Sequence, residues 1–185
     1  MGRLVVVTGG ARSGKSSFAE KLAKDCNCDV VYIATSIPFD DEMRARIKKH
    51  VDQRPSYWKT IEVYKDMDKH LANEKSEHVA FLLDCITIMI TNLMLDTPLD
   101  WDKASNEEID GVEAGIKMEM EKLLKAIKDK GTTFILVTNE IGMGIVPENR
   151  LSRIFRDIAG RINQMLAKAA DEVYLCVSGI PVKIK

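Results

Sequence analysis

A glycine-rich octapeptide near the start of the chain has the residue types and spacing needed to bind the phosphates of a nucleotide. It fits the pattern G-x-x-x-x-G-K-[ST] at every required position. Glycines let backbone N–H groups turn inward around phosphates, and the N-terminus of the next helix adds partial positive charge. Lys15 is expected to reach the β- and γ-phosphates, and the Ser16 hydroxyl to bind Mg²⁺. The expected phosphate-binding residues are Gly9, Gly10, Ala11, Arg12, Ser13, Gly14, Lys15 and Ser16.

The alternative for this segment is an ordinary strand-to-helix turn. That alternative would leave the lysine buried without an anion, which is costly. The context favours phosphate binding, because an apolar run precedes the glycines and a helical pattern follows them.

An acidic residue ends a later apolar run. Asp84 follows residues 79–83 and is expected to hold Mg²⁺, directly or through water. A turn or helix-capping aspartate is the alternative. Thr35 and Ser36 follow another apolar run, and Asn139 and Glu140 follow a third. Because the carboxyl ends of parallel strands meet at one edge of a sheet, these residues are expected to line the same crevice.

One histidine lies in a basic stretch. His50 ends the segment 44–50, which carries several Lys and Arg residues, and Arg54 follows it. On a helix, Arg46 and His50 would share a face. Neighbouring cations disfavour protonation of an imidazole, so they would leave a neutral, nucleophilic nitrogen and would also attract a triphosphate. The residues alone leave two interpretations open: a nucleophile, or a helix-end or surface histidine.

The residues between these motifs alternate short apolar runs with helical patterns. Strands are predicted at residues 4–7, 30–34, 79–83, 134–137 and 173–177, with a short antiparallel edge at 181–184. Helices are predicted at residues 15–24, 107–130 and 151–170. This alternation predicts an α/β fold of the P-loop NTPase (RecA-like) class, with a mostly parallel sheet flanked by helices.

Bulk properties predict one ordinary globular domain over residues 1–185. Residues 37–64 are expected to form an excursion from the sheet, with a short helix at about 41–50 that carries the histidine. The net charge of −1 gives no support for a nucleic-acid partner, and no apolar run is long enough to span a membrane. The four cysteines have no zinc or redox spacing, so reduced thiols and a cytoplasmic location are expected.

Residues spread along nearly the whole chain together resemble one enzyme family. The longest block is residues 137–150, which is specific, whereas the phosphate loop alone would not be. The other matching segments are residues 9–16, 32–36, 40–43, 46–47, 84–87, 91–92, 155–160 and 177–179, with His50, Arg54, Pro55, Trp58 and Glu62. The set resembles the bifunctional adenosylcobinamide kinase / adenosylcobinamide-phosphate guanylyltransferase of cobalamin biosynthesis.

The resemblance implies two reactions. In the first, ATP or GTP phosphorylates the hydroxyl of adenosylcobinamide. In the second, a histidine attacks the α-phosphate of GTP, releases pyrophosphate and passes GMP to adenosylcobinamide phosphate. The position that matches this histidine is His50.

The resemblance also implies the rest of the nucleotide site and the assembly. Arg54 would neutralise phosphate charge, and Glu62 would accept hydrogen bonds from either ribose hydroxyls or guanine N–H groups. The family forms ring-like homo-oligomers, so a trimer is expected. With the phosphate loop, the implied GTP-site residues are Ala34, Thr35, Ser36, Val51, Asp52, Gln53, Arg54, Glu62 and Asp84.

One residue departs from the family's pattern. Many relatives carry a second histidine just before the nucleophile, where this chain has Lys49. His50 is therefore the only candidate nucleophile, and any role of a paired histidine is in doubt here. Two other functions stay open: a plain small-molecule kinase with an idle His50, and a nucleotide-dependent binding module.

Overall fold

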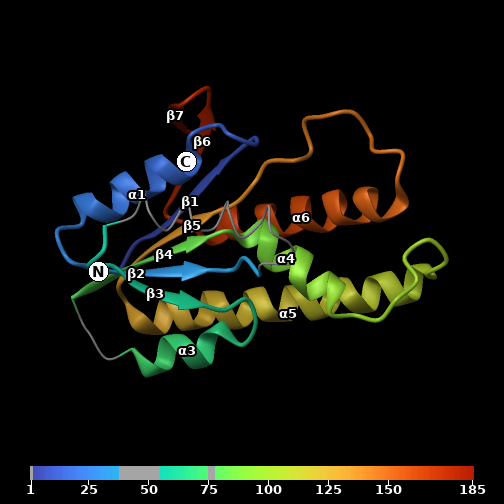
Figure 1. Ribbon diagram of the computed structural model, residues 1–185, viewed down its shortest axis with the longest axis horizontal. Helices are drawn as coiled ribbons and strands as arrows, with labels where there is room; N and C mark the ends of the chain where they lie inside the picture. The colour runs from blue at the N-terminus through green and yellow to red at the C-terminus, as the bar shows by residue number, and fades with distance from the viewer. Residues whose placement is uncertain (1, 38–54, 75–77) are drawn as a thin grey trace.

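The computed structural model describes residues 2–37, 55–74 and 78–185, and these residues build a seven-stranded sheet flanked by helices (Figure 1). The strands are β1 (Leu4–Gly9), β2 (Asp29–Ala34), β3 (Lys59–Glu62), β4 (Val79–Asp84), β5 (Thr133–Val137), β6 (Glu172–Val177) and β7 (Ile180–Lys183). The helices are α1 (Lys15–Asp25), α3 (Met67–Asn73), α4 (Ile86–Leu95), α5 (Asn106–Lys130) and α6 (Arg150–Ala169).

The strand order is β3-β2-β4-β5-β1-β6-β7, and every neighbouring pair is parallel except β6 and β7. The predicted α/β P-loop class, parallel sheet and antiparallel edge are therefore confirmed. In this order β5 lies between β1, which leads into the glycine-rich loop, and β4, which ends at Asp84.

Both faces of the central strands are buried, which explains why the strands are apolar at nearly every position. On one face, Val5 and Val7 of β1 belong to a core shared with Ala19 of α1. On the other face, Val6 belongs to a larger core shared with Met120 of α5. Figure 1 shows the corresponding layers, with α1 on one side of the sheet and α3 and α5 on the other. The sheet is thus held rigidly between two layers.

All six predicted strands and all three described predicted helices are present, with ends shifted by at most a few residues. The sequence did not predict β3, α3 or α4. The region 37–64 is not wholly an excursion, because residues 59–62 pair in parallel with β2 as an edge strand. The helix predicted at about 41–50 lies outside the described residues.

Local sequence signals fix the ends of the long helices. Ser105 and Glu108 form a reciprocal capping box at the start of α5, and Gly131 ends this helix in a left-handed conformation. Asn149 caps α6 by accepting a hydrogen bond from the amide of Ser152. The end of α5 at Gly131 sets where the chain re-enters the sheet at β5. The cap at Asn149 sets where the loop after β5 ends and α6 begins.

Arginines at the start of α6 fasten the long loop that connects it to β5. Arg150 donates hydrogen bonds of 2.6–3.0 Å to the carbonyl oxygens of Trp101, Asp102 and Ala104. Arg153 donates to the carbonyl oxygen of Pro147 at 2.9 Å. The loop is therefore tied to the α4–α5 connection and to α6.

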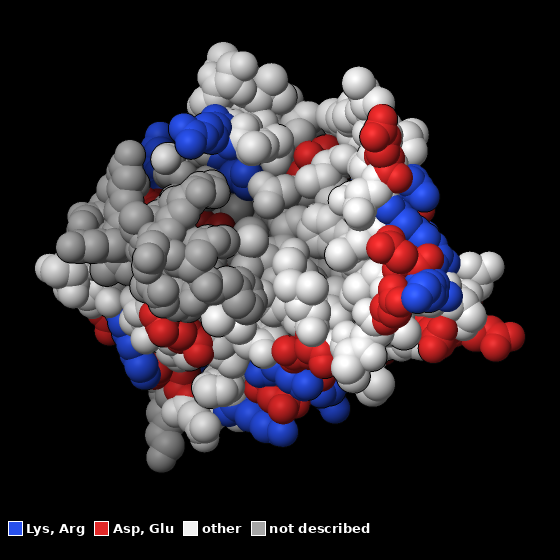
Figure 2. Space-filling model, turned by 45° about the vertical axis from the view of Figure 1, so that its right-hand side comes forward, with Lys and Arg blue, Asp and Glu red and all other residues white. Residues whose placement is uncertain are grey.

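The surface carries charges of both signs. On the face shown in Figure 2, Lys and Arg side chains are interspersed with Asp and Glu side chains, in agreement with a net charge of −1. Over the described parts of the chain, none of the helices combines the length and apolar character that crossing a bilayer requires.

Candidate nucleotide-binding site

The glycine-rich loop between β1 and α1 packs against β6, the strand beside β1, and against the β6–β7 turn. A Cβ atom placed on Gly9 would lie 2.5 Å from the carbonyl oxygen of Cys176 and 2.6 Å from Ser13 Oγ. Gly14 has φ of 89°, and a Cβ there would lie 2.9 Å from the Cα atom of Gly179. The amide of Gly179 also donates a 2.9 Å hydrogen bond to the carbonyl oxygen of Ser13. Glycine is therefore required at both positions to seat the loop on the β6–β7 turn.

Two polar side chains are buried inside this loop. Lys15 is only 8% exposed, and its ammonium group donates a 2.9 Å hydrogen bond to the carbonyl oxygen of Gly10. The hydroxyl of Ser13 is also buried and has no hydrogen-bond partner within the described parts of the chain. A buried cation and an unpartnered hydroxyl at the start of a helix fit an anion, because both would gain a partner from it.

The remaining loop residues are more accessible. Gly10, Ala11 and Arg12 are exposed, whereas Ser16 lies half-buried in the first turn of α1. The loop therefore combines an accessible rim with a buried lysine.

Three predicted residues end adjacent strands at one level of the sheet. In the strand register, Ala34 of β2 is paired with Glu62 of β3 on one side and with Asp84 of β4 on the other. Asp84 and Ala34 are half-buried, and Glu62 is exposed. The tertiary structure thus brings Ala34, Glu62 and Asp84 to the same edge of the sheet. The resemblance had implied Ala34 and Glu62 as site residues, but the sequence did not predict the strand that carries Glu62.

Thr35 connects two of these strand ends. It is 1% exposed, and its hydroxyl donates to the carbonyl oxygen of Cys85 at 2.8 Å and accepts from the Cys85 amide at 2.9 Å. The side chain of Asn92 in α4 donates a 2.7 Å hydrogen bond to the carbonyl oxygen of Thr35. Thr35 is therefore a structural clamp beside the site, and its hydroxyl is already used. Ser36 follows it and is half-buried.

The charges of the site affect two buried thiols. Burial, followed by the nearby charge of Asp84, raises the pKa of Cys85 from 9.0 to about 11, and the charge of Lys15 acts in the opposite direction. Burial also raises the pKa of Cys176, and Lys15 again opposes the shift. Neither thiol is reactive at neutral pH, because the thiolate is the nucleophilic form.

A network of hydrogen bonds holds the two residues that directly follow β5. The amide of Asn139 donates a 2.8 Å hydrogen bond to Thr87 Oγ1 of α4, and its carbonyl oxygen accepts a 3.0 Å hydrogen bond from Asn163 Nδ2 of α6. Thr138 Oγ1 donates to Asn163 Oδ1 at 2.7 Å. Sequence reasoning missed Thr138 and Asn163. The only signal for Asn163 is a polar residue within an otherwise apolar helical stripe.

Several predicted residues cannot be placed at the site. His50, Val51, Asp52, Gln53 and Arg54 lie outside the described residues.

Mg²⁺ was predicted to bind Ser16 and Asp84. Their hydroxyl and carboxylate oxygens fit the preference of Mg²⁺ for oxygen ligands. Within the described ranges, no cluster of three or more His, Cys, Asp or Glu residues could form a metal cage. An ion held by few protein ligands and by phosphate oxygens is consistent with this donor set.

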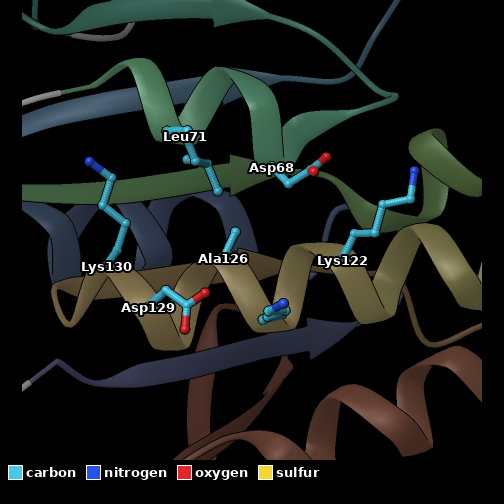
Figure 3. A pocket seen from close by; sticks show the side chains of 8 residues that line it. Asp68, Leu71, Lys122, Ala126, Asp129 and Lys130 are labelled. Carbon is cyan, nitrogen blue, oxygen red and sulfur yellow. The ribbon is translucent and has the colours of Figure 1, made fainter.

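A cavity of about 490 Å³ lies between α3 and α5 (Figure 3). Leu71 and Ala126 point toward one another there, and Lys122 and Lys130 lie on either side. Lys122 is paired with Asp66 and Glu119. Lys130 donates a hydrogen bond to the carbonyl oxygen of Glu74. This cavity contains none of the predicted site residues, and these two cations already have partners.

Comparison with known proteins identifies the family of this chain. The family model CobU, described as cobinamide kinase / cobinamide phosphate guanyltransferase, matches residues 5–184. The bifunctional adenosylcobalamin biosynthesis protein CobU of Salmonella typhimurium is 51% identical, with 98% of this chain and 99% of that protein covered. The protein of the same name from Escherichia coli is 48% identical, with the same coverage. The bifunctional adenosylcobalamin biosynthesis protein CobP of Pseudomonas aeruginosa is 38% identical, with 97% of this chain and 96% of that protein covered.

These matches run from β1 through β7 and so include the phosphate loop and each strand that ends beside it. The chain therefore belongs to the cobinamide kinase / cobinamide phosphate guanyltransferase family of enzymes.

Proposed function

We propose that this enzyme phosphorylates the hydroxyl of adenosylcobinamide with ATP or GTP and then transfers GMP from GTP to the product. The observation that carries the proposal is the glycine-rich loop, in which Lys15 is buried against Gly10 and Ser13 Oγ has no described partner. An anion would supply the missing partners. Family membership supports the identity of both substrates.

In the kinase step, the hydroxyl oxygen attacks the γ-phosphorus of the nucleotide. The bond between that phosphorus and the β,γ-bridging oxygen breaks, a nucleoside diphosphate leaves, and one proton is released. Lys15 holds the β- and γ-phosphates through this change, because charge on the phosphate oxygens requires fixed positive partners. Ser16 and Asp84 would hold Mg²⁺, which supplies additional positive charge to the phosphates when bound.

In the second step, a neutral nitrogen of His50 attacks the α-phosphorus of GTP. The bond from the α-phosphorus to the bridging oxygen breaks, and pyrophosphate leaves. The phosphate of adenosylcobinamide phosphate then attacks the same phosphorus and releases the histidine. Family membership and the basic stretch 44–50 support this role for His50.

The rest of the GTP site follows from the same proposal. Glu62, exposed at the edge of the sheet, would accept hydrogen bonds from the nucleoside, and Arg54 would neutralise phosphate charge. The backbone of residues 34–36 and the segment 51–54 would complete the pocket. Because the substrates are nucleoside triphosphates and a biosynthetic intermediate, we propose that the reaction takes place in the cytoplasm.

Covalent labelling tests this function. Purified enzyme incubated with α-³²P-labelled GTP and Mg²⁺ is expected to acquire acid-labile, base-stable label, and peptide mapping is expected to place it at His50. His50→Ala should lose the label and keep GTP affinity. Equal labelling of wild type and His50→Ala would overturn the proposed nucleophile. γ-Phosphate transfer without any covalent GMP would instead indicate a plain small-molecule kinase.

We propose that the active enzyme is a homotrimer, as the family resemblance implies. Sedimentation equilibrium is expected to give three times the chain mass of 20.8 kDa. A monomer that retains full activity would overturn this part of the proposal.

A further inference from the structure

The loop between β5 and α6 carries three exposed apolar side chains. Ile145 is 96% exposed, and Met143 and Val146 are exposed as well. A single exposed apolar residue is common on protein surfaces, whereas a group of them marks a binding surface more often. These three residues, all within four positions, form the apolar patch of the loop.

The loop begins beside the glycine-rich loop. The amide of Glu140 donates a 3.0 Å hydrogen bond to the carbonyl oxygen of Gly9. Ile145 follows five positions later, and five extended residues span at most about 18 Å. Figure 1 shows this loop (orange) running from β5 to the start of α6 on the side of the sheet toward which the β2 arrow points. The apolar patch therefore lies near the phosphate site, at the carboxyl ends of the strands.

Hydrogen bonds fix the backbone on both sides of the apolar patch. Before it, the amide of Gly142 donates to Glu140 Oε1 at 2.6 Å. After it, Arg153 donates to the carbonyl oxygen of Pro147 at 2.9 Å, and Arg150 fastens the start of α6 to the α4–α5 connection. A loop that is already held at both ends loses little conformational freedom when a ligand packs on it. The apolar side chains are thus presented by a preorganised backbone.

We propose that the apolar patch binds the corrin ring of adenosylcobinamide. The inference rests on the proposed function and adds a binding surface for the acceptor substrate. The corrin ring is a large macrocycle with methyl groups along its edge, whereas the hydroxyl that receives phosphate ends a flexible side arm. The ring must therefore lie beside the phosphates and within reach of that arm. Packing its edge against Met143, Ile145 and Val146 removes apolar surface of both partners from water.

The alternative occupant of the apolar patch is a second copy of the chain. A subunit interface of the usual size buries about 800 Å² on each side, which is more than three side chains can supply. The edge of one macrocycle needs only a small patch. The position of the patch beside the phosphate site also favours the substrate, because the ring must lie there for its hydroxyl to be phosphorylated. The same contact serves the second reaction, since adenosylcobinamide phosphate keeps the ring.

The direct test measures corrinoid affinity without turnover. Equilibrium dialysis, read from the visible absorbance of the corrin ring, gives the dissociation constant of adenosylcobinamide for wild type, Ile145→Ser and Met143→Ser. Each serine variant is expected to bind about tenfold more weakly, because it loses most of a side chain that the ring would bury. Ile145→Leu keeps the apolar surface and should bind within about twofold of wild type. Met118→Ser, which changes an exposed methionine of α5, is the matched control and should bind like wild type.

Steady-state kinetics show which substrate the apolar patch contacts. Ile145→Ser and Met143→Ser are expected to raise KM for adenosylcobinamide about tenfold and to leave kcat at saturating corrinoid nearly unchanged. The dissociation constant of GTP should stay within about twofold of wild type, because the glycine-rich loop is intact. Both side chains are exposed, so circular dichroism should show wild-type folding.

The outcomes separate this inference from the proposed function. If wild type does not phosphorylate adenosylcobinamide, the proposed function fails, and dialysis still tests the apolar patch. If folded Ile145→Ser and Met143→Ser both bind adenosylcobinamide like wild type, only the role of the patch is overturned. A loss of corrinoid affinity accompanied by a lower sedimentation mass would also overturn it, because the patch would then be a contact between copies of the chain.

Discussion

The ammonium group of Lys15 lies 2.9 Å from the carbonyl oxygen of Gly10, so the lysine closes the glycine-rich loop upon itself. Only 8% of Lys15 is exposed. A cation held this way has one neutral acceptor, and a phosphate would provide a charged one. Under the proposed function, Lys15 would exchange this neutral acceptor for a charged phosphate oxygen.

Replacing this lysine should weaken nucleotide binding. A charge-assisted hydrogen bond contributes about 1.5–3 kcal/mol, so Lys15→Met is expected to raise the dissociation constant for GTP roughly 10- to 150-fold. Isothermal titration calorimetry measures this constant directly. Lys21→Ala, which removes an exposed lysine of the same helix, should bind GTP like wild type. Comparable losses in both variants would show that general positive charge, not the buried ammonium group, binds the phosphates.

The first two glycines of the loop should respond differently to the same substitution. A Cβ at Gly9 would lie 2.5 Å from the Cys176 carbonyl oxygen, whereas a Cβ at Gly10 meets no atom within 4 Å. Gly9→Ala is therefore expected to lower the free energy of unfolding by about 1–3 kcal/mol through overpacking. Gly10→Ala should change it little. Urea denaturation of both variants measures the difference, and equal stabilities would contradict the close approach of the loop to β6.

The Thr35 hydroxyl should matter for stability more than its methyl group does. Thr35→Val would leave the buried amide of Cys85 without its partner, at a cost of about 1–3 kcal/mol, whereas the Cys85 carbonyl oxygen would keep the hydrogen bond that it accepts from the Met89 amide. Thr35→Ser keeps the hydroxyl and is expected to recover most of that free energy. Thermal unfolding followed by circular dichroism compares the two. If Thr35→Val were as stable as Thr35→Ser, this clamp between β2 and β4 would have no energetic role.

Cys85 should contribute a pH dependence to stability above neutrality. Burial raises its pKa in the folded protein from 9.0 to about 11, so the fold favours the neutral thiol. In the unfolded chain the thiol ionises first, and the unfolded state therefore binds fewer protons between these two values. The contribution of Cys85 to the free energy of unfolding is therefore fully present below pH 9. It is lost as the pH rises through 11, by about 2–3 kcal/mol in total.

The matched measurement is the free energy of unfolding of wild type and Cys85→Ala between pH 8 and pH 10.5. Tyrosine and lysine residues titrate in the same range in both proteins, so the difference between the two curves isolates Cys85. Wild type is expected to lose more stability than Cys85→Ala as pH rises. Parallel curves would show that Cys85 is accessible to water.

There are physical reasons why the sequence did not predict β3, α3 and α4. α4 is buried on nearly all sides, so its apolar residues show no period of 3.6 and resemble a continuation of the strand before it. β3 lies at the edge of the sheet and is exposed at three of its four positions, so it lacks an apolar run. α3 has only seven residues, too few to establish a helical period.

Sequence by itself determined the glycine-rich loop, the succession of the central strands and helices along the chain, and the acid at the end of β4. It could do so because these features depend on local residue types and short spacings. Only the tertiary structure decided that Thr87 and Asn163, which are 76 positions apart in the chain numbering, hold the same residue, Asn139. Hydrogen bonds between distant segments depend on how the helices pack across the sheet. The residue pattern of one segment does not predict that packing, because it contains no information about which distant segment lies beside it.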